Sequence, residues 1–219
     1  MENLMMVYGK PATDERYEEL NLWYTWEHIG DELMNRACLV VQRFELSRYQ
    51  PRNADTNFPV LCLYEVVDRD YCIRWHLKDA RTWRMKISTA LSREFYETFW
   101  NPVCKTSDWA EYADYRGEKA VLTIKLKAKP GKMEPKDYFT KEKLKELRCL
   151  PGFQALHLFD WHPEHQMPTT PPPLRNTVIT TWCARSPIAT WWPMNGTSIW
   201  THTRRSRKTS NCSRQSLNP

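Results

Sequence analysis

An internal repeat of strand and helix patterns limits the fold of this chain more than any other feature. Pro11 and Phe44 in the first half correspond to Pro130 and Phe159 in the second half, at a spacing of about 115 to 119 residues. A repeat of this length has room for a small unit with several strands and helices. We therefore expect two similar units in tandem.

The first unit alternates apolar strands with amphipathic helices. Thr13 or Asp14 is a suitable N-cap for the first helix, and Trp75, Trp83 and Leu91 recur at helical spacing in the second. The expected elements are a strand over 3–8, a helix over 13–35, strands over 37–46 and 58–67, a helix over 70–93 and a strand over 96–104. This β-α-β-β-α-β order is that of the ferredoxin-like unit, in which two helices cover one face of an antiparallel sheet.

The second unit repeats this pattern incompletely. Its expected elements are a strand over 119–130, a helix over 136–148, a strand over 150–159 and a further strand over 176–182. The residues that follow form a poor helix and a poor closing strand. The predicted fold class is therefore α+β, with tandem ferredoxin-like repeats of a dimeric α+β barrel type, of which the second is degenerate. The expected boundaries are a first repeat at 1–106, a second, incomplete repeat at 118–165 and an irregular tail at 166–219.

The tail differs from the rest of the chain in its charge. Seven of the 32 Lys and Arg residues lie beyond Glu164, where there is no Asp or Glu, so the net charge of +6 belongs to the tail. Residues 204–208 (RRSRK) suit a basic arm that contacts nucleic acid or an anionic surface. Alternatively, the tail translates an unspliced intron or a shifted reading frame, because folded segments of this length almost always keep acidic residues. We favour the second interpretation, which a comparison of transcript and genomic frame tests.

Several classes of protein are disfavoured by what the sequence lacks. It has no basic segment followed by an apolar stretch near its start and no run of 18 apolar residues, which predicts a cytoplasmic protein without a membrane span. With six glycines, it contains neither a Gly-rich phosphate loop nor a G-x-S-x-G motif. Seven scattered cysteines without a C-x-x-C pair indicate free, mostly buried thiols. His157, His162 and His165 form a weak metal-binding candidate because Pro163 interrupts them, and no metal is expected.

An aromatic helix contains the strongest candidate for chemistry. Within residues 17–28, Leu20, Tyr24 and His28 share one helical face, so the imidazole should point among apolar side chains rather than into water. Such a histidine either transfers protons near neutral pH or is a structural group that forms hydrogen bonds within the core. His76, on the second helix, is expected at the surface.

The same helix resembles that of a known family. Residues 23–28 (WYTWEH) resemble the W-Y-x-x-E-H helix of EthD-like proteins in the dimeric α+β barrel superfamily, and residues 43–44 (RF) resemble the end of their next strand. Residues 61–65 (LCLYE) are similar to their L-A-L-Y-E strand, and residues 150–153 (LPGF) to their L-P-G-F turn, here in the second repeat. The second repeat has residues 138–143 (YFTKEK) in place of W-Y-x-x-E-H, and so lacks the acid–histidine pair. The resemblance therefore implies one site, in the first repeat, and a barrel closed between two chains or within one.

The resemblance also implies a function. It suggests an apolar pocket between sheet and helices, and a cofactor-independent cyclase, dehydratase, decarboxylase or oxygenase acting on an aromatic or polyketide-like intermediate, plausible in secondary metabolism. His28 is the candidate for proton transfer. Glu27, the second catalytic candidate, or another nearby carboxylate would orient His28. Neighbours on a helix point about 100° apart, however, so that Glu27 more readily pairs with Arg43 or caps another group.

The candidate substrate contacts come from the same region. They are Trp23, Tyr24, Arg43 and Tyr64, although aromatic residues at helical spacing are more often part of the core. The expected partners are a small hydrophobic substrate and, as one option, a second copy of the chain. Nucleic acid is not expected, since the folded part is slightly acidic. The alternative function is a barrel that binds a ligand or a partner without chemistry.

Overall fold

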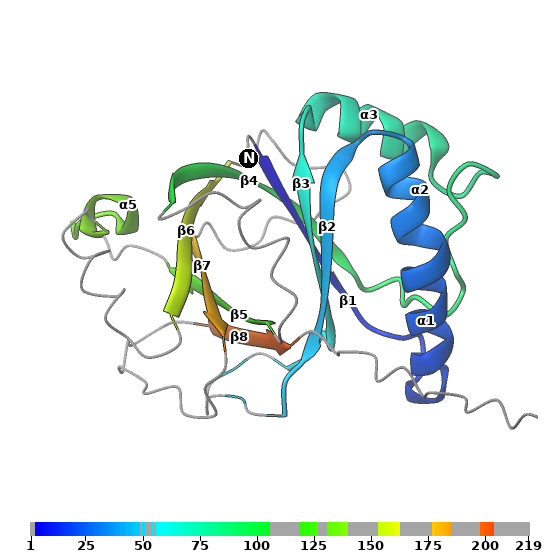
Figure 1. Ribbon diagram of the computed structural model, residues 1–219, viewed down its shortest axis with the longest axis horizontal. Helices are drawn as coiled ribbons and strands as arrows, with labels where there is room; N and C mark the ends of the chain where they lie inside the picture. The colour runs from blue at the N-terminus through cyan, green and yellow to red at the C-terminus, as the bar shows by residue number, and fades with distance from the viewer. Residues whose placement is uncertain are drawn as a thin grey trace, which may run out of the picture.

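The computed structural model describes most of the first repeat and separate segments of the second (Figure 1). The described residues are 3–48, 50, 54, 56–105, 119–126, 131–139, 153–162, 177–184 and 198–203.

The described strands form a closed barrel in the order β1-β3-β2-β8-β5-β7-β6-β4, and every neighbouring pair is antiparallel (Figure 1). The strands of the first repeat are β1 (Asn3–Gly9), β2 (Cys38–Leu46), β3 (Val60–Val66) and β4 (Tyr96–Lys105). Those of the second repeat are β5 (Lys119–Leu126), β6 (Phe153–Trp161), β7 (Thr177–Ala184) and β8 (Ser198–Thr203). The barrel is therefore completed within one chain, which is one of the two arrangements that the resemblance implied.

The two halves of the barrel have the same strand order. The first half runs β4-β1-β3-β2 and the second runs β8-β5-β7-β6, and they join where β2 meets β8 and β4 meets β6. β1 begins at Asn3 and β5 at Lys119, while β2 begins at Cys38 and β6 at Phe153. Both pairs are separated by the repeat spacing read from the sequence. The expected tandem α+β fold is therefore confirmed.

The segment expected as an irregular tail contains two strands of this barrel, of which β7 matches the strand expected over 176–182, whereas β8 was expected only as a poor closing strand. β7 pairs with β5 and β6, and β8 pairs with β5 and β2. The basic charge and the prolines of this segment do not prevent strand formation, because strand pairing needs only backbone groups and suitable side chains, such as the β-branched residues in residues 177–181 (TVITT).

Helices cover the outer face of β1, β3 and β2 (Figure 1). They are the 3₁₀ turn η1 (Asp14–Arg16), the continuous helix formed by α1 (Tyr17–Trp23), the π-helical turn η2 (Tyr24–His28) and α2 (Ile29–Met34), and the separate helix α3 (Arg69–Asp79). Asp68 caps α3, since its carboxylate accepts a hydrogen bond of 2.8 Å from the Tyr71 backbone N–H. In the second repeat, the helix expected over 136–148 is described only at α5 (Pro135–Tyr138), and the rest of it lies outside the described residues.

The helix predicted over 70–93 ends early, at Asp79. Ala80 has an extended backbone with ψ of 135°, and Arg81 has a positive φ of 67°. The Thr82 hydroxyl donates a hydrogen bond of 2.6 Å to the Asp79 carbonyl and so satisfies a group at the helix end. Trp83, expected on the buried face, is consequently 85% exposed. Helical spacing of apolar residues does not show where a helix stops.

Two apolar cores lie on opposite faces of the first-repeat strands. The core inside the barrel takes side chains from both repeats: Leu4, Met6, Tyr8, Phe44, Phe58, Leu61, Leu63, Trp100, Val121, Phe159 and Trp161. The core between strands and helices belongs to the first repeat and includes Met5, Val7, Leu20, Trp23, Tyr24, Cys62, Tyr64, Cys72, Trp75 and Phe99. Alternate residues of each strand supply the two cores, as the pleat of a strand requires.

Two of the sequence expectations can be compared with this part of the structure. Cys38, Cys62 and Cys72 are free and buried, as expected for these three. Among the described helices, none is long and apolar enough to cross a membrane.

Candidate active site

His28 lies inside the core between strands and helices. It ends the π-helical turn η2 and is only 7% exposed. Its ring stacks on the indole of Trp23, with centroids 4.7 Å apart, and meets the edge of the Tyr24 ring at 4.9 Å. The prediction that this imidazole points among apolar side chains is confirmed. π-helical turns inside α-helices are frequent at functional sites.

A chain of ionisable groups continues from His28 beneath the helices. The His28 Nε2 is 3.8 Å from Oε1 of Glu32, one helical turn further on. That carboxylate is 2.9 Å from Nε2 of His76 on α3, and the His76 Nδ1 is 2.9 Å from Oε1 of Glu97 on β4. The long helix, α3 and β4 thus bring four side chains into one series of contacts.

Among these four ionisable side chains, His76 carries the positive charge. Burial lowers the pKa of His76, but the carboxylates of Glu97 and Glu32 outweigh burial and raise the pKa to about 10. At neutral pH both ring N–H groups therefore donate to carboxylates. The expectation that His76 lies at the surface is wrong: it is 4% exposed, because the two acids that stabilise its charge come from other elements.

His28 is neutral in the same environment. Burial, together with the positive charge of His76, lowers the pKa of His28 to about 3. The nearby Glu32 carboxylate favours the tautomer with the proton on Nε2. The Nδ1 atom then carries a lone pair, and in the described structure this buried atom has no hydrogen-bond partner. A buried ring nitrogen without a partner is a place where a ligand group can bind or give up a proton.

Glu32, rather than Glu27, is the acid beside His28. Glu27 is exposed, and Arg43, its expected partner, donates instead to Asn21 Oδ1 and lies 3.6 Å from a carboxylate oxygen of Glu45. Glu27 and His28 point apart, as expected for adjacent residues of a helix. The nearby carboxylate that the sequence left unnamed is Glu32, which lies four positions further along the helix and shares the face of His28.

Tyr24, Arg43 and Tyr64 form a cluster next to His28. The Tyr64 hydroxyl donates to the Tyr24 hydroxyl at 3.4 Å, and the Arg43 guanidinium lies 5.8 Å from the centre of the Tyr24 ring. Burial raises the pKa of both tyrosines well above the ordinary value, so both phenols stay protonated. The structure therefore brings these predicted residues together.

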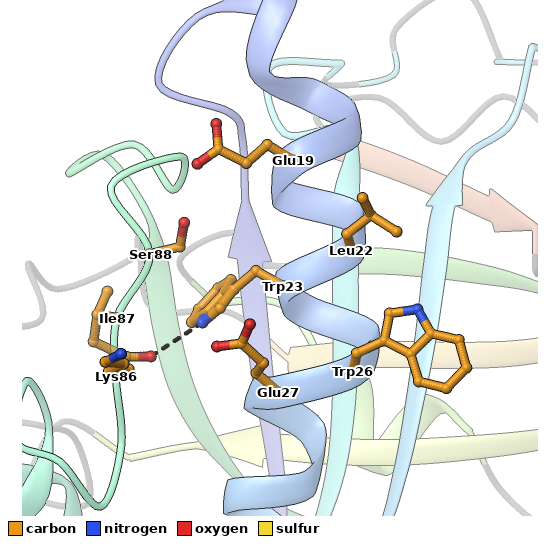
Figure 2. Close-up of a pocket in the computed structure, with 8 residues that line it drawn as sticks. All are labelled: Glu19, Leu22, Trp23, Trp26, Glu27, Lys86, Ile87 and Ser88. Carbon is orange, nitrogen blue, oxygen red and sulfur yellow. Dashed lines mark hydrogen bonds between the residues drawn. The ribbon is translucent and has the colours of Figure 1, made fainter.

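A groove of about 590 Å³ lies on the other side of Trp23, between the long helix and a loop (Figure 2). Its lining residues are Glu19, Leu22, Trp23, Trp26, Glu27, Lys86, Ile87 and Ser88. The Trp23 indole N–H donates a hydrogen bond of 3.1 Å to the Lys86 carbonyl across the groove. Trp23 thus separates the groove from His28. Of the predicted site residues, Trp23 and Glu27 line this groove, whereas His28, Tyr24, Arg43 and Tyr64 lie in the core beside it.

The weak metal-binding candidate is only partly described. His157 stacks on Phe159 inside the barrel, with centroids 6.1 Å apart, and His162 lies 3.7 Å from Asp160. His165 is outside the described residues. Within the described part of the chain, no three His, Cys, Asp or Glu side chains are placed to hold a metal ion.

Two solved structures share this fold. One is a putative monooxygenase from Lactobacillus acidophilus NCFM, with a TM-score of 0.53 and 10% identity over 92% of this chain and 93% of that one. The other is an anthrone oxidase-like protein, with a TM-score of 0.51 and 7% identity over 92% of this chain and 90% of that one. No family model matches the sequence, and no curated protein does. The chain thus has the ferredoxin-like, dimeric α+β barrel fold, and at these identities the likeness concerns the fold alone.

Proposed function

We propose that the first repeat is a proton-transfer site for a hydrophobic, planar substrate, of the EthD-like kind and independent of a cofactor. The reaction belongs to the cyclase, dehydratase, decarboxylase or oxygenase types, on an aromatic or polyketide-like intermediate. The observation that supports this proposal most strongly is the buried Nδ1 of His28, which has no hydrogen-bond partner. The names of the two fold neighbours, a putative monooxygenase and an anthrone oxidase-like protein, favour oxygenation among these types.

The groove supplies the entrance for such a substrate. Trp26 is 62% exposed and Leu22 is also exposed, so one wall offers aromatic and aliphatic surface to a flat ring system. Contact with His28 requires the Trp23 indole to swing aside and give up its stacking on His28, its burial in the core and its hydrogen bond to Lys86, of which the hydrogen bond alone contributes about 1 kcal/mol. Trp23 then serves as both the cover of the imidazole and a surface on which the substrate stacks.

Proton transfer follows from the tautomer of His28. A carbon acid of the substrate gives its proton to Nδ1, and the carbanion remains delocalised over the substrate rings. The low pKa of His28 applies to the empty site, where burial opposes the charged form. An anion formed beside the ring, together with the Glu32 carboxylate, raises that pKa during the reaction. Tyr24 and Tyr64 remain neutral phenols nearby that can donate hydrogen bonds.

Oxidation of anthrone tests the proposal. Anthrone and O₂ give anthraquinone and water, a reaction that starts with loss of a ring-flanked CH₂ proton. We expect the full-length protein to accelerate anthraquinone formation, measured by absorbance, and His28→Gln to lower the rate at least about a hundredfold. His162→Gln, a partly exposed histidine at the end of β6, is the matched control and should keep the rate. Equal rates for His28→Gln and the unmodified protein would refute the role of His28.

The position of Trp23 also favours a second candidate function. Because the indole closes the groove from His28, the groove can bind a ligand without chemistry. Under this alternative, anthrone quenches the fluorescence of Trp23 and Trp26 with the same affinity in the unmodified protein and in His28→Gln, and neither protein accelerates the oxidation.

A further inference from the structure

We propose that Glu32, His76 and Glu97 form a proton path between His28 and water, in which Glu32 is the positioning residue for the imidazole. This inference rests on the proposed function, because it names the route by which a proton taken up at His28 leaves a site closed to solvent.

The four side chains of the path follow one another at short separations and end at the most exposed of them. The successive separations are 3.8 Å, 2.9 Å and 2.9 Å, and the last two are hydrogen-bond distances. The exposed fraction of the side chain is 9% at His28, falls to 1% at Glu32, and then rises to 4% at His76 and 14% at Glu97. The path therefore begins at a buried imidazole and ends at a carboxylate that meets solvent.

Of the described charged groups that shift the pKa of Glu32, one is a cation. The charged groups are the His76 imidazolium and the carboxylates of Glu97 and Asp31. Burial raises the pKa of Glu32, and the hydrogen bond from His76 lowers it. Glu32 is thus a carboxylate that can take a proton for a short time, which a relay requires.

The thiols and phenols near Glu32 do not compete for the proton. Burial raises the pKa of Cys38 to about 12 and of Cys62 to about 11, and it raises the pKa of Cys72 further. Tyr24 and Tyr64 are shifted in the same direction. All of these groups stay neutral near pH 7, so charge moves along the histidines and carboxylates alone.

The steps balance as a relay of one proton. The Nδ1 of His28 gains the substrate proton as its Nε2 passes a proton to Glu32. The His76 Nδ1 proton moves to Glu97 and then to water, which leaves a neutral His76 ring with its remaining proton on Nε2. Rotation of this ring by about 180° turns the empty Nδ1 toward Glu32, which gives it the proton received from His28 and restores the His76 imidazolium. One proton has entered at Nδ1 and one has left at Glu97. The path runs in reverse when Nδ1 returns a proton to the product.

Exchange of the His28 ring proton with solvent tests the path without a substrate. In the full-length protein labelled with ¹⁵N-histidine, the exchange rate of the His28 Nε2–H is measured by NMR. We expect Glu97→Gln to slow this exchange about tenfold or more, because an amide cannot take up the proton. The matched control is Glu94→Gln, which removes an exposed carboxylate that pairs with Lys10, and it should leave the rate unchanged.

If His76 and Glu97 form only a structural ion pair, the exchange rate of the His28 Nε2–H should change in the opposite direction. Loss of the Glu97 carboxylate would then loosen the layer between sheet and helices and speed exchange through local opening. Unchanged or faster exchange in Glu97→Gln therefore overturns the path. If Glu97→Gln does not fold, the same measurement on Glu97→Asp, whose shorter carboxylate lies farther from His76, replaces it: slower exchange supports the path, and unchanged or faster exchange overturns it.

The path and the proposed function fail in distinguishable ways. Slowed exchange in Glu97→Gln without any anthrone oxidation refutes the proposed function and leaves the path in place as a property of the fold. If anthrone oxidation depends on His28 but the exchange rate of the His28 Nε2–H is the same in Glu97→Gln, the path alone is refuted.

Discussion

In the first repeat, helices cover the outer face of the sheet and enclose the line from His28 to Glu97, whereas the second repeat keeps the strand order without these residues. At the positions that correspond to His28 and Glu32, the second repeat has Lys143 and Leu147. Glu97 is the second residue of β4, and the second residue of β8 is Ile199.

This difference shows which features of a repeat depend on few specific residues. Strand order requires only backbone pairing and apolar side chains on alternate positions, which many sequences supply. A buried chain of charges requires its partners from three elements at once, since removal of one partner leaves another buried and unpaired. We therefore expect the first repeat to contain the chemistry and the second to complete the barrel.

The largest effect is expected from removing strands of the second repeat, which tests whether that repeat is needed for the barrel to fold. Deletion of residues 166–219 removes β7 and β8 and leaves β5 without either neighbour. We expect the cooperative thermal transition to disappear and the protein to aggregate, as judged by circular dichroism and size-exclusion chromatography. Deletion of residues 204–219, which spares every described strand, is the control. A 1–165 protein that melts like the full chain would contradict the role of β7 and β8 and favour the reading-frame explanation of the tail.

The second-largest effect is expected when Glu32 of the first repeat is replaced by the residue at the corresponding position of the second repeat, Leu147. Glu32→Leu copies Leu147 and leaves the His76 imidazolium with one of its two carboxylates, so we expect the free energy of unfolding to fall by roughly 3 kcal/mol. The double variant Glu32→Leu/His76→Leu should recover part of that loss, because it removes the cation as well. Urea unfolding measures both, and a double variant less stable than Glu32→Leu would argue against the buried ion pair.

A smaller effect appears in the pH dependence of stability. The unfolded chain protonates His28 near pH 6.5, whereas the folded pKa is about 3, so the folded state loses stability as the pH falls from 6.5, by at most about 1.4 kcal/mol per pH unit. His76, with its raised pKa, contributes stability that is complete below pH 6.5 and is lost as the pH rises through about 10. His28→Gln should flatten the acid side alone in urea unfolding between pH 5 and 7, a range over which the effect is at most about 2 kcal/mol. A variant as acid-sensitive as the unmodified protein would show that His28 is not neutral when folded.

The smallest expected effect separates stability from binding. Trp26→Lys copies Lys141 of the second repeat at an exposed position and should change the free energy of unfolding by less than about 0.5 kcal/mol. The same variant should weaken anthrone binding, measured by quenching of the remaining tryptophan fluorescence, because the groove loses its exposed aromatic wall. Unchanged affinity would mean that the ligand binds elsewhere.

The predictable parts of this structure are those determined by local pattern. The inward direction of His28 follows from its spacing to Leu20 and Tyr24, and the tandem repeat follows from spacing along the chain. The burial of His76 did not follow, because its two carboxylates lie on other elements and no local pattern links them. The end of α3 did not follow either, because the extended backbone at Ala80 and the contacts of Thr82 with the Asp79 carbonyl are not revealed by apolar spacing.

The protonation state of His28 is the most direct test of the account. In ¹⁵N-histidine-labelled protein at pH 7, we predict a neutral ring with its proton on Nε2, and ring nitrogen shifts that remain constant until the pH falls below about 4. A His28 that titrates near pH 6.5, or that carries its proton on Nδ1, would contradict the assignment of a buried imidazole held ready to accept a proton.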